Sequence, residues 1–265
     1  MAIFIPSLFM AVLGAVFGAL LTMASKKFYV EMDPRVEEVR ACCSGANCGA
    51  CGYAGCDGFA EAVVKGEAPT HGCKPGGNAA AEAIAAVMGT AATLSEPLVA
   101  RVLCQGSTAM AKERYTYNGV PSCRVAASIA GGPKQCRFSC LGLGDCMAKC
   151  SFNAIRMEHD LCVIDPEICT GCGACADECP RSVIQLLPKS KPVIVRCRNT
   201  DTARVARDLC MTACIGCKKC ERSCKYDAIK VEDGFARIDP SKCVSCGECA
   251  KGCPCHCISV PNAAA

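Results

Sequence analysis

The chain begins with a long apolar segment. Residues 2–24 carry no charged side chain, and this length is sufficient for a helix to cross a bilayer. Lys26 and Lys27 follow at once, and no basic residue precedes the segment. Because basic flanks stay on the cytoplasmic side, the pattern predicts a membrane anchor with the rest of the chain in the cytoplasm. A cleaved signal peptide is the competing interpretation, but the segment lacks a charged n-region.

Beyond this anchor, apolar residues occur in short runs that predict small elements. Residues 57–65 have a helix-like pattern, and residues 98–103 and 192–195 are apolar runs typical of short buried strands. Each of these two strands ends near a cysteine, Cys104 and Cys197. Free cysteine is among the most buried residue types, so both are expected to lie in the core.

The second half of the chain is an internal duplication. Adding 74 to the position of a cysteine leads to another cysteine in nine cases, without a gap. Such a register predicts two copies of one structural unit. One position breaks it, because Leu143 stands where the second copy has Cys217. The nine pairs are Cys123–Cys197, Cys136–Cys210, Cys140–Cys214, Cys146–Cys220, Cys150–Cys224, Cys169–Cys243, Cys172–Cys246, Cys175–Cys249 and Cys179–Cys253.

The chain contains 29 cysteines, a proportion that usually signals a disulfide scaffold. The spacings are instead those of metal ligands. Residues 169–180, CTGCGACADECP, have the C-x2-C-x2-C-x3-C-P spacing of a bacterial ferredoxin, in which three thiolates hold one [4Fe–4S] cluster and the fourth reaches another. Zinc is the alternative for any C-x2-C pair. Four cysteines in this register favour iron–sulfur clusters, which require reduced thiolates and hence a reducing compartment.

Crossed ligation of this kind predicts two clusters in each ferredoxin-like module. In the second module, the two predicted ligand sets are Cys214, Cys217, Cys220 and Cys253, and Cys224, Cys243, Cys246 and Cys249. In the first module, the complete set is Cys150, Cys169, Cys172 and Cys175.

The other cluster of the first module lacks one ligand, because Leu143 replaces a cysteine. Cys140, Cys146 and Cys179 remain. Since four-thiolate ligation is the usual requirement, Cys136, four residues before Cys140, is the predicted fourth ligand. A three-iron cluster, or no cluster at this place, is the alternative.

A further cysteine group precedes the two modules. Its members are Cys48, Cys51, Cys56 and Cys73. Four thiolates in a short, glycine-rich segment suit one [4Fe–4S] cluster. Cys42 and Cys43 lie just upstream, but adjacent side chains cannot easily both reach one cluster.

Five clusters at four cysteines each use 20 of the 29, and nine remain. This count leaves room for a sixth cluster. In the crowded C-terminal run CPCHC, the side chains of Cys255, His256 and Cys257 are expected to be exposed, and so open to oxidation or to a partner. The unassigned cysteines are Cys42, Cys43, Cys104, Cys123, Cys162, Cys197, Cys210, Cys255 and Cys257.

The formal net charge of +4 is too small to indicate a nucleic-acid partner. One basic cluster lies among the predicted ligands of the second module: Lys218, Lys219, Arg222 and Lys225. It is either an ordinary solvated loop or a docking rim for an acidic electron donor such as soluble ferredoxin. With no P-loop and no nucleotide or flavin-attachment motif, we assign no catalytic residue and expect a chain that passes single electrons.

The segment NCGACGYAGC and the closing CKPGG are similar to the small iron–sulfur domain of the B subunit of Rnf complexes. The anchor and the two modules extend this resemblance over essentially the whole chain. It implies a membrane-anchored redox subunit that accepts electrons from reduced ferredoxin and relays them to flavin-bearing partner subunits. The complex would couple ferredoxin oxidation and NAD reduction to Na⁺ or H⁺ translocation.

The predicted fold class is α+β, with a transmembrane helix (1–27), a small [4Fe–4S] domain (28–97), a linker with a short strand (98–135) and two two-cluster modules (136–188 and 189–265). The predicted location is the inner (cytoplasmic) membrane, crossed once, with the soluble part in the cytoplasm. Two other functions stay open: a membrane-tethered polyferredoxin feeding another redox complex such as a hydrogenase, and a zinc-bearing interaction protein without a redox role.

Overall fold

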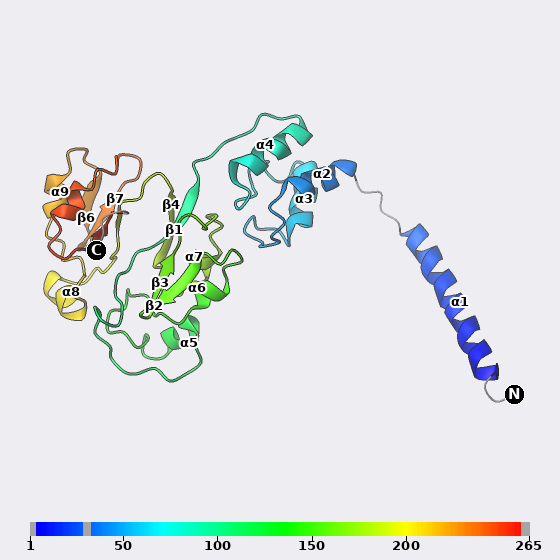
Figure 1. Cartoon of the computed structure of the whole chain (residues 1–265), viewed down its shortest axis with the longest axis horizontal. Helices are drawn as coiled ribbons and strands as arrows, with labels where there is room; N and C mark the ends of the chain where they lie inside the picture. The colour runs from blue at the N-terminus through cyan, green and yellow to red at the C-terminus, as the bar shows by residue number, and fades with distance from the viewer. Residues whose placement is uncertain (1–3, 29–32, 261–265) are drawn as a thin grey trace.

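The computed structural model describes residues 4–28 and 33–260. Helix α1 (Phe4–Lys27) stands apart from the rest of the described chain (Figure 1). Its 24 residues give a length of about 36 Å, more than the roughly 30 Å of a bilayer core. Among the described residues it is the one helix long and apolar enough to cross a membrane, judged by length and composition. Lys26 and Lys27 lie in its last turn.

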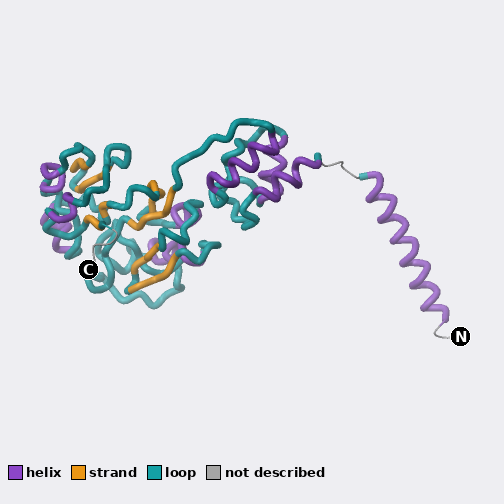
Figure 2. Tube along the Cα trace, turned by 45° about the horizontal axis from the view of Figure 1, so that its top comes forward, coloured by secondary structure: helices purple, strands orange, loops and turns teal. Residues whose placement is uncertain are grey.

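Three helices form a small N-terminal domain: α2 (Pro34–Cys42), α3 (Cys56–Val64) and α4 (Gly77–Met88). The Asp33 side chain caps α2 by accepting a hydrogen bond from the Arg35 N–H, at 2.9 Å. Each helix contributes fully or almost fully buried apolar side chains to one core, among them Val39, Phe59 and Ile84. The helices pack around this core, and the loops that join them lie beside the helices (Figure 2).

The two hairpins of the C-terminal half confirm the 74-residue repeat. Strands β2 (Ile155–Glu158) and β3 (Leu161–Ile164) form one antiparallel pair, and β6 (Ile229–Glu232) and β7 (Phe235–Ile238) form the other. Every bound of the second pair coincides with its counterpart in the first when the repeat register is applied.

Each module has a second antiparallel pair that joins distant segments. Strand β1 (Leu98–Val102) pairs with β4 (Ile184–Pro188), and β5 (Ile194–Val195) pairs with β8 (Ile258–Ser259). The two short strands expected from the apolar runs are therefore present. Strand β1, placed in the linker by its sequence position, contributes half of a sheet in the first module.

Short helices begin directly after the cysteine loops. Each is preceded by a residue with positive φ, which lets the loop reverse direction before the helix starts. These helices are α6 (Asp145–Ala148), α7 (Ala174–Glu178), α9 (Lys219–Ser223) and α10 (Glu248–Lys251).

The segment after β1 contacts the second module through Met110 and Lys112. The N–H of Lys112 donates to the Leu209 carbonyl and the N–H of Met211 donates to the Met110 carbonyl, both at 2.9 Å. Lys112 also forms an ion pair with Asp208, at 2.5 Å. This part of the chain therefore packs onto helix α8 (Ala203–Leu209) of the second module, and it holds the modules side by side (Figure 1).

The first predicted pair of the repeat, Cys123 and Cys197, does not hold in the structure. Cys123 begins helix α5 (Cys123–Ser128), whereas Cys197 lies two residues beyond strand β5. The structural counterpart of Cys197 is Cys104, two residues beyond strand β1. The segment from Cys104 to Cys136 is longer than the segment from Cys197 to Cys210, so strand β1 lies outside the 74-residue register.

Gly171 lies where the first cysteine loop touches strand β1. Its φ is +67°, and a Cβ at this position would clash with the Leu98 carbonyl. We expect Gly171→Ala to lower the free energy of unfolding by about 2–4 kcal/mol, because left-handed strain and a backbone clash add together. Gly66→Ala is the matched control, since Gly66 has φ +78° and open space around it, and it should cost only about 1 kcal/mol. Equal losses in denaturant unfolding of the two variants would contradict the assigned contact.

Candidate metal centres

Three cavities in the two modules are each lined by one complete predicted ligand set. They span about 320, 350 and 330 Å³, part of it open to solvent. The sets are, in that order, Cys214, Cys217, Cys220 and Cys253; Cys224, Cys243, Cys246 and Cys249; and Cys150, Cys169, Cys172 and Cys175. In each set, three cysteines of one run meet a fourth from the other run of the same module.

Backbone N–H groups point at the sulfur atoms in these loops. Ala100 donates to the Cys169 sulfur, Ala228 to the Cys224 sulfur and Ser245 to the Cys243 sulfur, each at 3.4 Å. Such bonds stabilise a thiolate and tune a bound metal centre. The donor to Cys169 lies on strand β1, so the pairing of β1 with β4 also completes this site.

The linings suit a soft metal centre. Apart from the cysteines, the first of these cavities is lined by Ile, Val, Ala and Pro side chains, and thiolates in an apolar site favour iron–sulfur clusters or zinc. Burial raises the pKa of Cys220 and Cys249 to about 11 and that of Cys175 to about 12. These thiols are therefore neutral before metal binding, and ligation would release their protons. In the described part of the chain, no group of three or more His, Cys, Asp or Glu side chains is spaced to hold a single metal ion.

The incomplete set of the first module has an unexpected neighbour. Cys140 and Cys146 are buried in the module core with Cys179 packed against them. Cys162, on strand β3, is fully buried, and its sulfur lies 3.5 Å from that of Cys146. Its backbone N–H bonds the Cys140 sulfur.

Comparison with the second module shows which surface the Cys162 side chain faces. Its counterpart in the repeat is Ala236, whose N–H bonds the Cys214 sulfur and which lines the cluster cavity of that module. Cys162 thus lies at a position that faces the predicted ligands Cys140 and Cys146. Leu143, the residue in place of a cysteine, packs instead with Cys123 and Leu141.

Cys136 was expected beside Cys140, Cys146 and Cys179, but the structure places it with a different group of cysteines. It lines a cavity with Cys104, Cys197 and Cys210, and burial raises its pKa to about 11. The repeat holds a signal that the sequence analysis did not use: Cys162 stands where the second copy has Ala236, on the strand next to the ligand loop of the module that lacks one cysteine.

The N-terminal group occupies the loops between α2, α3 and α4. Cys73 is buried, and Cys48, Cys51 and Cys56 are half-buried. The N–H of Cys56 donates to the Asn47 side chain at 2.9 Å, which fixes the start of α3. Cys43, unassigned from sequence, lies beside Cys73, and its thiol donates to the Val39 carbonyl at 3.3 Å. The interaction between the two thiols lowers the pKa of Cys73 to about 5 and raises that of Cys43.

The expectation that Cys255 and Cys257 are exposed is wrong, because both side chains are buried. Cys255 is 8% and Cys257 1% exposed, and both line the cavity of the Cys253 set. The Cys257 sulfur lies 3.5 Å from that of Cys253. Strand β8 begins directly after Cys257 and pairs with β5, which turns these two side chains inward, while His256 remains on the surface.

Three segments of the chain match known families. Residues 45–75 match the family described as "Putative Fe-S cluster". Residues 162–185 match the 4Fe-4S binding domain, and residues 213–257 match the 4Fe-4S dicluster domain. Each segment contains predicted ligands, so [4Fe–4S] clusters are the cofactor that the donor sets and the family matches both support.

Similar proteins extend this match to nearly the whole chain. Over 259 residues, the chain is 46% identical to the B subunit of the Na(+)-translocating ferredoxin:NAD(+) oxidoreductase complex of Acetobacterium woodii, covering 97% of this chain and 78% of the relative. The chain belongs to the B-subunit family of the Rnf complexes. Another member is the B subunit of the ion-translocating oxidoreductase complex of Methanosarcina acetivorans, 40% identical over 88% of this chain and 89% of the relative. The B subunit of the proton-translocating ferredoxin:NAD(+) oxidoreductase complex of Clostridium ljungdahlii is also 40% identical, over 88% of this chain and 82% of the relative.

Membership of the Rnf B-subunit family decides between the functions left open by the sequence. The chain is an electron-transfer subunit of an Rnf-type redox complex, with 4Fe-4S ferredoxin-type domains behind one candidate membrane helix. The polyferredoxin of another complex is not favoured, and the 4Fe-4S family matches speak against a zinc-bearing interaction protein.

Proposed function

We propose that this chain accepts electrons from reduced ferredoxin and relays them, through about five [4Fe–4S] clusters, to flavin-bearing partner subunits. The complex would couple ferredoxin oxidation and NAD reduction to Na⁺ or H⁺ translocation. The observation that carries the relay is the set of three similar cavities, each lined by four predicted ligands. When bound, a [4Fe–4S] cluster takes up and releases one electron, and the chain supplies the thiolates and the N–H donors that set its potential.

We assign the fourth cluster of the two modules to Cys140, Cys146, Cys179 and Cys162. This assignment replaces Cys136 by Cys162, on the basis of the contact between Cys162 and Cys146 and the place of Ala236 in the second module. Cys48, Cys51, Cys56 and Cys73 hold the fifth cluster, in the segment that matches the Fe–S cluster family.

We further propose that the modules lie in the cytoplasm. The support is the pair Lys26 and Lys27 in the last turn of α1, since basic residues stay on that side. Protease added to inverted membrane vesicles should then remove the modules, and protection of the modules would refute this orientation.

The basic cluster of the second module is a suitable docking surface for the donor. Lys218, Lys219, Arg222 and Lys225 are all solvent-accessible. Lys218 and Lys219 lie between two predicted ligands, Cys217 and Cys220. Among the described residues of this module, the basic residues that form ion pairs are Lys189, Lys230, Arg237 and Lys251. The four side chains thus remain available to steer an acidic protein toward the cluster that Cys217 and Cys220 would bind.

Charge reversal tests this surface. We expect Lys218→Glu with Lys219→Glu to slow reduction of the chain by reduced ferredoxin about 10- to 100-fold at low salt, because electrostatic steering accelerates association. The difference should shrink at high ionic strength, where the charges are screened. Stopped-flow absorbance of the clusters measures the rate.

The matched control is Lys65→Glu with Lys74→Glu, which makes the same change of net charge in the N-terminal domain, where both lysines are exposed. Its rate should stay close to that of the unmodified chain. Equal rates for both double variants would refute docking at the basic cluster, although the relay itself would stand.

A further inference from the structure

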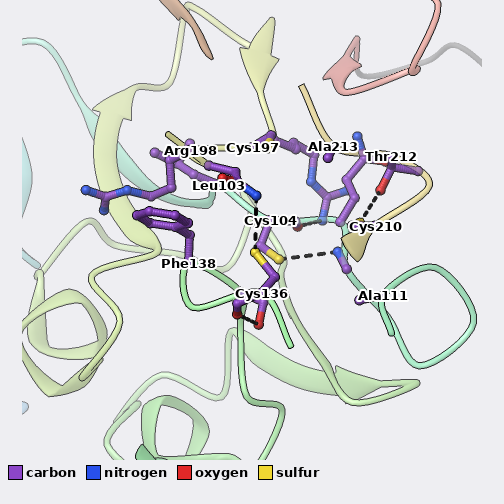
Figure 3. Close-up of a pocket in the computed structure, with 15 residues that line it drawn as sticks. Leu103, Cys104, Ala111, Cys136, Phe138, Cys197, Arg198, Cys210, Thr212 and Ala213 are labelled. Atoms are coloured by element: carbon purple, nitrogen blue, oxygen red, sulfur yellow. Dashed lines mark hydrogen bonds between the residues drawn. The ribbon is translucent and has the colours of Figure 1, made fainter. Parts of the chain in front are cut away.

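A fourth cavity of the same size lies where the two modules meet. It spans about 350 Å³, part of it open to solvent, and four of its lining residues are cysteines: Cys104, Cys136, Cys197 and Cys210 (Figure 3). Its volume equals that of the cavity lined by Cys224 and its partners. Three of the four, Cys104, Cys197 and Cys210, were unassigned by spacing, because they come from different parts of the chain.

The four cysteines are two equivalent pairs, one from each module. Cys136 and Cys210 are counterparts in the repeat register and so occupy the same place in each module. Cys104 follows Val102, which pairs with Ile184, and Cys197 follows Val195, which pairs with Ile258. Ile184 and Ile258 are counterparts in the same register. The four cysteines that line the cavity thus stand at the same two positions of each module.

Polar hydrogen atoms point at these sulfurs as they do at the ferredoxin-type sites. The N–H of Gly106 and the N–H of Cys140 donate to the Cys104 sulfur, at 3.3 and 3.4 Å. The Asn199 side-chain amide donates to the Cys136 sulfur at 3.7 Å, and Asn199 is itself buried, with 1% exposed. A Cβ on Gly106 would lie 3.4 Å from the Cys104 sulfur and 3.9 Å from the Cys210 sulfur, so both sulfurs lie close to this one backbone position.

Positive charge is buried beside the cavity. Lys134 is 1% exposed, and its Nζ donates to the carbonyl of Gly106 at 2.6 Å and to that of Asp160 at 2.8 Å. Half-buried Arg196 donates to the Cys104 carbonyl at 3.1 Å. Both cations donate hydrogen bonds to carbonyl oxygens. Among the described residues, neither of them forms an ion pair. Buried cations are costly without nearby negative charge, and four thiolates around a metal centre would supply it.

We propose that Cys104, Cys136, Cys197 and Cys210 hold a sixth [4Fe–4S] cluster at the junction of the two modules. Its ligands are divided equally between the modules, so the cluster fixes how they dock as well as adding a redox centre between them. The proposal does not depend on the identity of the electron donor. It also explains why Cys136 is not required by the Cys140 set.

Iron counting on the full chain, purified anaerobically, tests the proposal. We expect about 24 iron atoms in the unmodified chain, since each cluster holds four. In Cys104→Ala and in Cys210→Ala the content should fall to about 20, or to about 23 if the remaining three thiolates hold a three-iron cluster. Cys123→Ala is the matched control, because Cys123 is equally buried but does not line the cavity, and its iron should not change. About 20 iron atoms in the unmodified chain, unaffected by Cys104→Ala and Cys210→Ala, would overturn the proposal. One zinc per chain, lost in both variants, would overturn the assignment of a cluster.

Native mass spectrometry of the unmodified chain supplies a measurement that needs no variant to fold. Six clusters in the intact mass support the proposal, and five contradict it. If the proposed electron relay itself were wrong, the unmodified chain would contain almost no iron, which differs from both of these outcomes.

Discussion

Replacement of Cys162 by alanine is expected to remove one cluster from the first module. The iron content should fall by about four atoms, or by about one if the remaining three thiolates hold a three-iron cluster. The reason is that Cys162, fully buried and 3.5 Å from Cys146, is the fourth thiol of a set that has only three cysteines in its loops. Iron analysis and EPR of the oxidised and reduced chain measure the loss.

A second substitution makes this prediction sharper. Leu143 occupies the position of Cys217, and the loops agree in shape, since Gly142 and Gly216 have φ +79° and +60°. Leu143→Cys should therefore restore the lost iron in the Cys162→Ala background. Cys123→Ala serves as the control for loss of a buried thiol. Unchanged iron in Cys162→Ala would show that Cys162 is not a ligand, and a loss that Leu143→Cys does not restore would contradict the assumed likeness of the two loops.

Removal of iron is expected to unfold both modules. Five of the eleven buried residues in each module core are cysteines, and four two-stranded sheets are too small to be stable alone. Metal binding therefore supplies much of the folding free energy, on the order of 10 kcal/mol per site in small metal domains. Anaerobic chelation should abolish the cooperative thermal transition of residues 98–260.

The N-terminal helices provide an internal comparison in that experiment. Val39, Phe59 and Ile84 form an apolar core, so part of the helical signal should survive chelation. Return of iron and sulfide under reducing conditions should restore the transition. A cooperative transition of the same midpoint in the iron-free chain would contradict a structural role for the clusters.

Local patterns in the sequence were sufficient to predict the architecture of the modules. The 74-residue register placed the hairpins, and the ferredoxin spacing predicted three ligand sets that the structure brings to three cavities. These features depend on contacts within a single repeat. The apolar runs before Cys104 and Cys197 also predicted two strands correctly.

Contacts between distant segments could not be predicted in this way. The pairing of β1 with β4 joins Val102 to Ile184, far apart in the sequence, and no local pattern encodes it. The convergence of Cys104, Cys136, Cys197 and Cys210 depends on how the two modules dock. The same docking buries Cys210, which had no assigned role from its spacing alone.

The most direct test of the central claim is electron uptake by the full chain. Reduced ferredoxin would be mixed anaerobically with the purified chain, and the product frozen for low-temperature EPR alongside an iron determination. We predict bleaching of the cluster absorbance and EPR signals of several interacting reduced [4Fe–4S] clusters in a chain with at least about 20 iron atoms. A colourless chain, or an iron-loaded chain that takes no electron from reduced ferredoxin, would contradict the account.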